Sequence, residues 1–241
     1  ARYFITQQTL LIASTSREEY DERSSLIRKK VSEACGIMLP AMSIVAQSPA
    51  RGSEVVLELI SSRATPGKEI VYKSAGGYSY TVVNYGSFKV VHATGLTGGP
   101  GDSIQESAEK AFKSAMEILD IEGLSMNHII RQWNYVEDIA HIEDPSRTTQ
   151  NYQVFNDVRA KYYSQAAFPA GYPAATGIGM TTGGVIIGFI AVSDSDRVKI
   201  KSIRNPRQID AHRYSDRVLV GKTTGIMGGR CTPKFERGKM V

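Results

Sequence analysis

The sequence predicts an α+β fold, in which a mixed β-sheet carries two helices packed on one face. Between residues 78 and 193 the elements follow the order strand, strand, helix, strand, helix, strand, strand. The apolar run at 184–192 is too short to span a bilayer and is typical of a buried strand. Helices interspersed with strands in this way bury their apolar stripes against a single sheet.

The chain of 241 residues, 41% of them apolar, can form one large domain or two smaller ones. We expect three regions. Residues 1–77 form an N-terminal α+β region, residues 78–193 the α+β module, and residues 194–241 a turn-rich segment that leads into a truncated second module.

The N-terminal region begins with a strand pattern at 3–13 and a charged helix at about 18–35. Two further apolar runs follow at 44–46 and 55–61. Turn residues Pro66-Gly67 and Gly76-Gly77 close the region.

The module opens with a predicted hairpin, residues 80–85 and 88–93, turning at Gly86. Ser103 and Glu106 form a capping-box pattern that starts a helix, which Gly123 ends. The loop 98–101 before this helix lacks the lysine and the spacing of a phosphate loop, so we interpret it as a plain connection. The helix has one apolar stripe, made of Ala108, Ala111, Phe112, Ala115, Met116 and Leu119.

A strand at 129–136 follows, on which Arg131, Trp133 and Tyr135 share one face because side chains alternate. A loop through Asp144-Pro145 leads to a second helix at about 151–164. The small-residue strand 172–180 and the apolar strand 184–193 complete the module.

Composition argues against several classes of function. The net charge is +5, but the basic residues after Lys199 alternate with acidic ones, so a nucleic-acid track is not expected. Nothing resembles an export signal or a membrane span, and we expect a cytoplasmic protein. Cys35 and Cys231 are expected to be free thiols, Cys231 a buried one, and the four histidines form no ligand pattern. We therefore expect neither a metal nor a cofactor.

Residues 78–193 resemble the RidA family of reactive-intermediate deaminases, which older names call translation initiation inhibitors or endoribonucleases. The matching segments are 95–106, 136–139, 155–163 and Pro173-Ala-Ala-Thr176. The resemblance implies a mixed sheet with two helices on one face and ligand sites at the clefts of a trimer. The chain would be a homotrimer or a monomer that mimics one, with the N-terminal region forming or completing a second related module.

At Ala175 the deaminases usually carry an arginine that grips the substrate carboxylate. The chain is more similar to the chorismatase branch, through segments 131–135, 152–156 with Arg159, and 173–179. Segments 205–208, 212–214 and 232–235 carry the same resemblance. It implies hydrolysis of chorismate to pyruvate and a cyclic carboxylate. The family's catalytic glutamate lies past the point that matches Val241, so no catalytic residue is assigned.

The candidate substrate-binding residues come from this resemblance and from their chemistry. Two fixed guanidiniums, Arg131 and Arg159, suit the two carboxylates of a dicarboxylate. Tyr135 and Tyr152 can pack against a ring and donate a hydrogen bond, whereas we assign Trp133 to the core. The small residues and hydroxyl of the next strand let a ligand approach the backbone, and Met180 would fill space near the ring; these strand residues are Ala175, Thr176, Gly177 and Gly179.

Each of these residues also has a purely structural interpretation. Arg159 suits a helix surface, and Arg131 can pair with a nearby acid. Aromatic residues on strands and helices are more often core, and glycines within strands mark bulges or close packing.

The leading hypothesis is a chorismatase-like enzyme that cleaves the enol ether of chorismate or a related cyclic carboxylate. The alternatives are a non-catalytic RidA-like protein that binds a small metabolite, and a RidA-type imine deaminase. All three imply a small-molecule partner, in the first case a small carboxylate.

Overall fold

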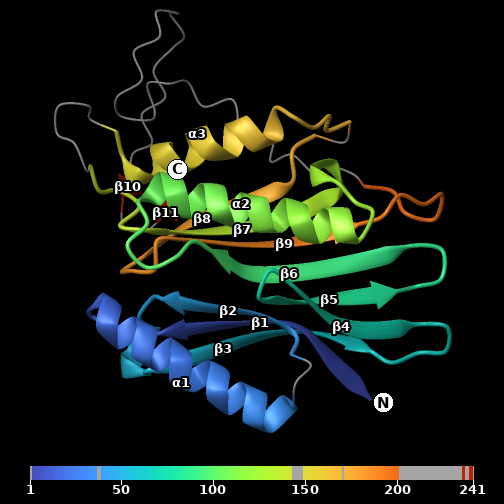
Figure 1. Ribbon diagram of the computed structural model, residues 1–241, viewed down its shortest axis with the longest axis horizontal. Coiled ribbons are helices and arrows are strands. Elements are labelled where there is room, and N and C mark those ends of the chain that lie inside the picture. Colours follow the sequence, from blue (N-terminus) through green and yellow to red (C-terminus); the bar gives the residue numbers. More distant parts are fainter. Residues whose placement is uncertain are drawn as a thin grey trace, which may run out of the picture.

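The computed structural model describes residues 2–36, 39–142, 149–169 and 171–200, and the short strands β10 (Phe235–Glu236) and β11 (Lys239–Met240). Figure 1 shows four layers: two helices, a six-stranded sheet, a three-stranded sheet and a third helix. The expected loop at Asp144-Pro145, the motifs at 205–208, 212–214 and 232–235, and Cys231 lie outside the described residues. Cys35 is an exposed free thiol.

The six-stranded sheet has the order β4-β5-β6-β9-β7-β8, and only β7 and β8 are parallel. Its strands are β4 (Glu69–Ala75), β5 (Tyr78–Asn84), β6 (Lys89–Thr97), β7 (Ile129–Glu137), β8 (Ala174–Met180) and β9 (Val185–Val192). Helices α2 (Ile104–Ile121) and α3 (Asn151–Tyr163) cover one face, as expected (Figure 1). The predicted α+β class and this arrangement are confirmed.

Helix α2 forms as its sequence predicts. The Ser103 hydroxyl accepts a hydrogen bond from the Glu106 amide, and the Glu106 carboxylate accepts from the Ser103 amide. Its apolar stripe then enters the main core, where the Phe112 ring stacks on Phe155 and Tyr162 of α3. None of the helices in the described ranges is long and apolar enough to cross a bilayer.

The sequence places the start of the module at residue 78, but the six-stranded sheet extends further towards the N-terminus. Strand β4, for which the sequence pattern predicts no element, pairs along its length with β5 across the Gly76-Gly77 turn. The six-stranded sheet therefore begins at Glu69. Of the expected segment 194–241, only 194–200 and the two short strands are described.

The N-terminal region forms a separate three-stranded sheet in the order β2-β1-β3. The elements of this region are β1 (Tyr3–Ile12), α1 (Arg17–Cys35), β2 (Ala41–Ala46), the short 3-10 helix η1 (Ala50–Gly52) and β3 (Val55–Arg63). A second 3-10 turn, η2 (Met126–His128), precedes β7. Helix α1 packs on the face of the small sheet that points away from the large one (Figure 1).

This N-terminal unit repeats the topology of β7-α3-β8-β9. In both units a strand pairs with a parallel strand after a helix, and with an antiparallel strand on its other side. The registers coincide as well, since Gln7 pairs with Ala41 and Ile60 as Arg131 pairs with Ala174 and Ile190. In both units the antiparallel pairing has a register shift just before this residue, between Ile5 and Gln7 in one and between Ile129 and Arg131 in the other. The N-terminal region is thus a partial second module.

The two sheets pack face to face through a polar layer. The hydroxyls of Ser43 on β2 and Thr94 on β6 share a hydrogen bond of 2.8 Å, and the Ala41 amide donates to the Thr81 hydroxyl at 3.3 Å. Backbone also meets backbone, because a Cβ at Gly95 would lie 2.2 Å from the Met42 carbonyl oxygen. Only glycine fits this contact.

His92 of β6 lies in the layer between the sheets and makes the fold sensitive to acid. The residue is 7% exposed, and burial lowers the pKa of its imidazole to about 4. The unfolded chain takes up this proton near pH 6.5, so stability is lost as pH falls from about 6.5 towards 4. We expect a loss of about 1.5 kcal/mol between pH 6.5 and 5 that the variant His92→Gln does not show.

The measurement is the urea midpoint at both pH values. The exposed His141, replaced by glutamine, is the control and should keep the wild-type slope. An unchanged slope in His92→Gln would show that His92 is not the group responsible.

Candidate functional site

Strand β7 places Arg131, Trp133 and Tyr135 on the face that looks towards the small sheet, confirming that they share a face. The parallel register brings Thr176 of the edge strand β8 beside them. The Arg131 guanidinium donates from Nη2 to the Thr176 hydroxyl at 3.0 Å, and it stacks over the Trp133 ring at 4.8 Å. The alternative of an acid paired with Arg131 is not found among the described residues, so the guanidinium keeps donors for a ligand.

Tyr135 is buried beside Val45, Met180 and Ile186, whereas Trp133 is half-buried at the edge of this cluster. Burial raises the pKa of the Tyr135 phenol, with Glu58 of β3 raising it further, while Arg131 and a hydrogen bond with Thr9 lower it. Its hydroxyl therefore lies close to β1 and β3. Met180 packs against this cluster at the end of β8.

The other expected residues lie on the helix side of β8. The ring of Tyr152, in the first turn of α3, covers Gly177 so closely that a Cβ there would be 2.9 Å from it. Gly179 meets Ile139 in the same way, again at 2.9 Å. Ala175 is exposed on this side. The small residues of β8 thus accommodate Tyr152 and Ile139.

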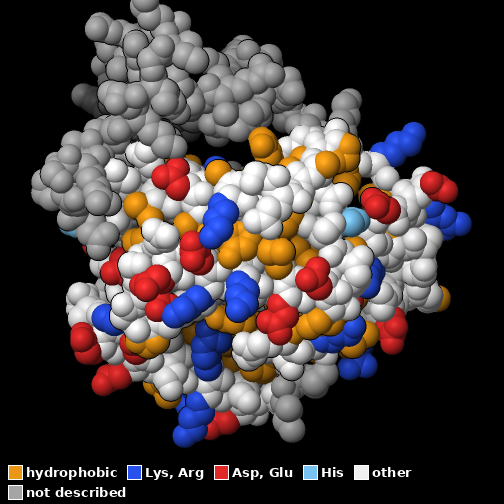
Figure 2. Space-filling view, turned by 45° about the horizontal axis from the view of Figure 1, so that its top comes forward, with side chains coloured by type: hydrophobic (Ala, Val, Ile, Leu, Met, Phe, Trp, Pro, Cys, Tyr) orange, Lys and Arg blue, Asp and Glu red, His pale blue; other side chains and the backbone are white. Residues whose placement is uncertain are grey.

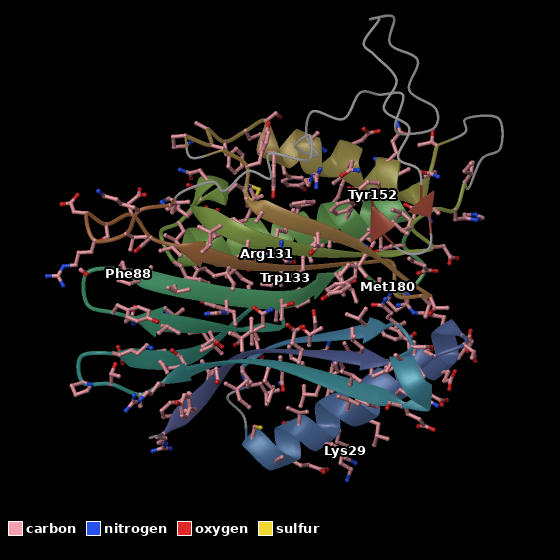
Figure 3. All side chains as sticks on the ribbon, turned by 180° about the vertical axis from the view of Figure 1, so that it is seen from behind. Lys29, Phe88, Arg131, Trp133, Tyr152 and Met180 are labelled. Atoms are coloured by element: carbon pink, nitrogen blue, oxygen red, sulfur yellow. The ribbon has the colours of Figure 1, made fainter. Side chains whose placement is uncertain are left out.

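Arg159 of α3 stacks over the rings of Phe155 and Tyr163, at 5.8 and 6.0 Å. It is half-exposed, and these stacking contacts belong to the helix layer. The structure therefore places Arg131 and Arg159 on opposite faces of the sheet and does not bring them together. Figure 3 shows the same separation, with Tyr152 on the α3 side and Arg131 and Trp133 towards the small sheet.

A recess of about 630 Å³ opens at the carboxyl ends of β2, β7 and β8. Gly179 and Met180 line it, together with Asp138 and His141 from the turn after β7. Asp138 adopts φ of 40°, a conformation that costs a non-glycine residue roughly 1–3 kcal/mol and is frequent at functional sites.

The sequence patterns do not single out Asp138 or His141. The available signal was their position directly after a strand, at the sheet end where parallel strands place functional groups. A single aspartate and a single histidine in a loop carry too little information to be chosen from sequence.

In Figure 2, lysine, arginine and acidic side chains alternate over the described part of the visible face. Several form pairs, including Lys110 with Asp102 and Lys161 with Glu109.

A mixed sheet with two helices on one face is the α+β arrangement that the resemblance to the RidA family implied. The family described as chorismatase FkbO/Hyg5-like, N-terminal, matches residues 65–191, which include all of the six-stranded sheet except the last residue of β9. This chain belongs to that family.

Part of the chain is also similar in sequence to two enzymes. The chain is 31% identical over 119 residues to the 3-hydroxybenzoate synthase of Streptomyces hygroscopicus, covering 49% of this chain and 33% of that protein. It is 36% identical over 105 residues to the chorismatase of Streptomyces rapamycinicus, covering 42% of this chain and 29% of that protein. The chain thus spans about a third of the length of these relatives.

A crystal structure of a chorismatase has the same fold. The superposition covers 88% of this chain and 55% of that chain, with a TM-score of 0.54 and 18% sequence identity. It includes part of the N-terminal region as well, because the 177 residues from 65 to 241 make up less than 88% of the 241-residue chain.

Proposed function

We propose that the protein acts as a chorismatase-like enzyme, which cleaves the enol ether of chorismate or a related cyclic carboxylate and releases pyruvate. One observation carries the proposal: in a chain of this family, Arg131 is held by Thr176 and Trp133, while its remaining donors form no ion pair with an acid in the part of the chain that the structure describes. A fixed guanidinium of this kind suits a planar carboxylate.

In the proposed reaction the methylene carbon of the enol ether takes up a proton. Water then adds to the resulting oxocarbenium carbon, and the hemiketal collapses to pyruvate and a ring alcohol. Arg131 would hold a substrate carboxylate, and the Trp133 ring would bound the substrate on the half-exposed face of β7. Protonation of carbon needs a carboxylic acid held neutral in a dry site.

The described residues supply binding groups more clearly than this acid. Where the pKa of a described carboxyl group is shifted, it is lowered by hydrogen bonds and positive neighbours; these groups are Glu18, Glu19, Asp102, Glu106 and Glu122. This observation favours a second candidate, a RidA-like protein that binds a small carboxylate without turning it over.

The assay is pyruvate release from chorismate by the intact protein. We expect Arg131→Gln to lower kcat/KM by roughly 100-fold, because a charged pair of hydrogen bonds is lost. Arg159→Gln, on the other face, should change it by less than about threefold.

The outcomes separate the candidates. Stabilisation of the protein by chorismate without pyruvate release would favour the binding protein, and pyruvate release insensitive to Arg131→Gln would remove the proposed site. Imine deamination is the least favoured activity, because the alanine side chain of Ala175 offers no guanidinium for the substrate carboxylate.

A further inference from the structure

A second pocket, of about 340 Å³, lies beside the start of β2, where residues of α1, β5 and β6 also line it. We name it the Arg28 pocket. Its walls come from the start of β2, the start of β5 and the second half of β6; residues that matter below are Arg28, Pro40, Met42, Tyr78, Ser79 and Thr97. It is separate from Arg131, since β9 lies between β6 and β7 in the sheet.

The pocket exists because β6 leaves β5 partway along its length. The two strands pair only as far as Tyr80 and Ala93, and β6 then has a register shift before Leu96. Bulges of this kind often re-aim a strand next to a functional site. The contact of Gly95 with the Met42 carbonyl fixes β2 against β6 and so fixes one wall.

Among the residues that line the pocket, Arg28 alone carries a charge, and it forms no ion pair with an acid on its own helix. Elsewhere on α1, Arg17 pairs with Asp21, Arg23 with Glu19, and Lys30 with Glu33. The positions three and four residues from Arg28 hold Ser24, Ser25, Val31 and Ser32. Arg28 also has no ion-pair partner elsewhere among the described residues, so its guanidinium is available to an anion at the pocket rim.

The remaining lining suits a compact ring. Leu39, Pro40 and Met42 offer apolar surface, and Tyr78 also lines the pocket. The Tyr78 hydroxyl already donates to the Thr97 carbonyl at 2.6 Å, which orients the ring. Ser79 adds a hydroxyl. A volume of about 340 Å³ lies at the lower end of the range of small-molecule sites.

We propose that the Arg28 pocket is a second ligand site, which binds a small aromatic or cyclic monocarboxylate. The carboxylate meets Arg28 at the rim, and the ring lies against Pro40, Met42 and Tyr78. This site is independent of the Arg131 face and of whether that face supports catalysis.

The test uses the whole chain with Arg131→Gln, so that the first site is impaired, and benzoate as the probe. Binding is followed by titration calorimetry and by amide NMR shifts of Ser79, Gly95 and Thr97. We expect saturable binding that shifts these signals and that Arg28→Gln weakens about tenfold or more.

Lys29→Gln is the matched control, because Lys29 has the same charge on the same helix but does not line the pocket, and it points into solvent (Figure 3). It should change the affinity by less than about twofold. Ser79→Phe, which fills the pocket without changing charge, should abolish binding.

Several results would overturn the proposal. One is equal weakening by Arg28→Gln and Lys29→Gln, which would indicate general attraction to a basic surface. Phosphate binding as tightly as benzoate would show that the ring contributes nothing, and benzyl alcohol binding as tightly would show the same for the charge. If Ser79→Phe does not fold, the comparison of the Arg28 and Lys29 variants still decides.

Discussion

Replacing Gly95 with alanine is expected to destabilise the protein by about 3 kcal/mol or more. Two costs add at this position. Gly95 has φ of 78°, which strains any residue with a side chain, and its new Cβ would lie 2.2 Å from the Met42 carbonyl oxygen. The obstacle is backbone, so it cannot turn aside as a flexible side chain would. Relief requires the two sheets to separate at β2 and β6.

The matched control is Gly86→Ala in the turn between β5 and β6. Gly86 has nearly the same φ, 82°, but its Cβ would meet no atom within 4 Å. Its cost should be about 1–2 kcal/mol, the conformational part alone. Denaturant unfolding measures both variants, and equal losses would mean that the contact between the sheets is not a constraint.

Glu122→Ala is expected to cost about 2–3 kcal/mol. The Glu122 side chain is only 3% exposed at the end of α2, and it accepts hydrogen bonds from Lys73 at 2.8 Å, Tyr80 at 2.9 Å and Lys89 at 3.1 Å. These partners lie on β4, β5 and β6, so one carboxylate ties the helix to three strands. The lysines remain partly solvated, which keeps the loss below that of a fully buried pair.

The same network has a pH signature. Burial by itself would raise the pKa of the Glu122 carboxyl. The hydrogen bonds from Lys73, Lys89 and Tyr80 together have the larger effect and hold this pKa below the usual value of 4.5. Its stabilisation is therefore present above pH 4.5 and is lost as pH falls through the lowered pKa.

The surface pair of Glu109 with Lys161 provides the control on the same helix. Glu109→Ala should cost less than about 1 kcal/mol, because both groups are solvated. A loss in Glu122→Ala no larger than in Glu109→Ala would contradict the structural role of the network.

Local signals predicted much of the fold. The capping box at Ser103 and the apolar stripe of α2 are encoded within a few residues, and both appear as expected. Strand β4 was missed because it is an edge strand with half-exposed side chains, so its sequence shows neither a buried run nor clean alternation.

The candidate site was predictable only where one strand determines it. The common face of Arg131 and Tyr135 follows from strand geometry, and the parallel register adds Thr176. The side on which α3 lies does not follow, because β7 carries polar and apolar residues on both faces. Arg159 and Tyr152 could therefore not be separated from Arg131 in advance.

The repeated unit has a consequence for handling the protein. Strand β9 is flanked by β6 and β7, but its counterpart β3 has a neighbour on one side only among the described strands. Val55, Val56, Leu57 and Leu59 of β3 are 41–50% exposed. Exposed apolar side chains and unpaired backbone amides on a strand favour self-association. Leu57→Lys should therefore raise the concentration at which the purified chain stays monodisperse.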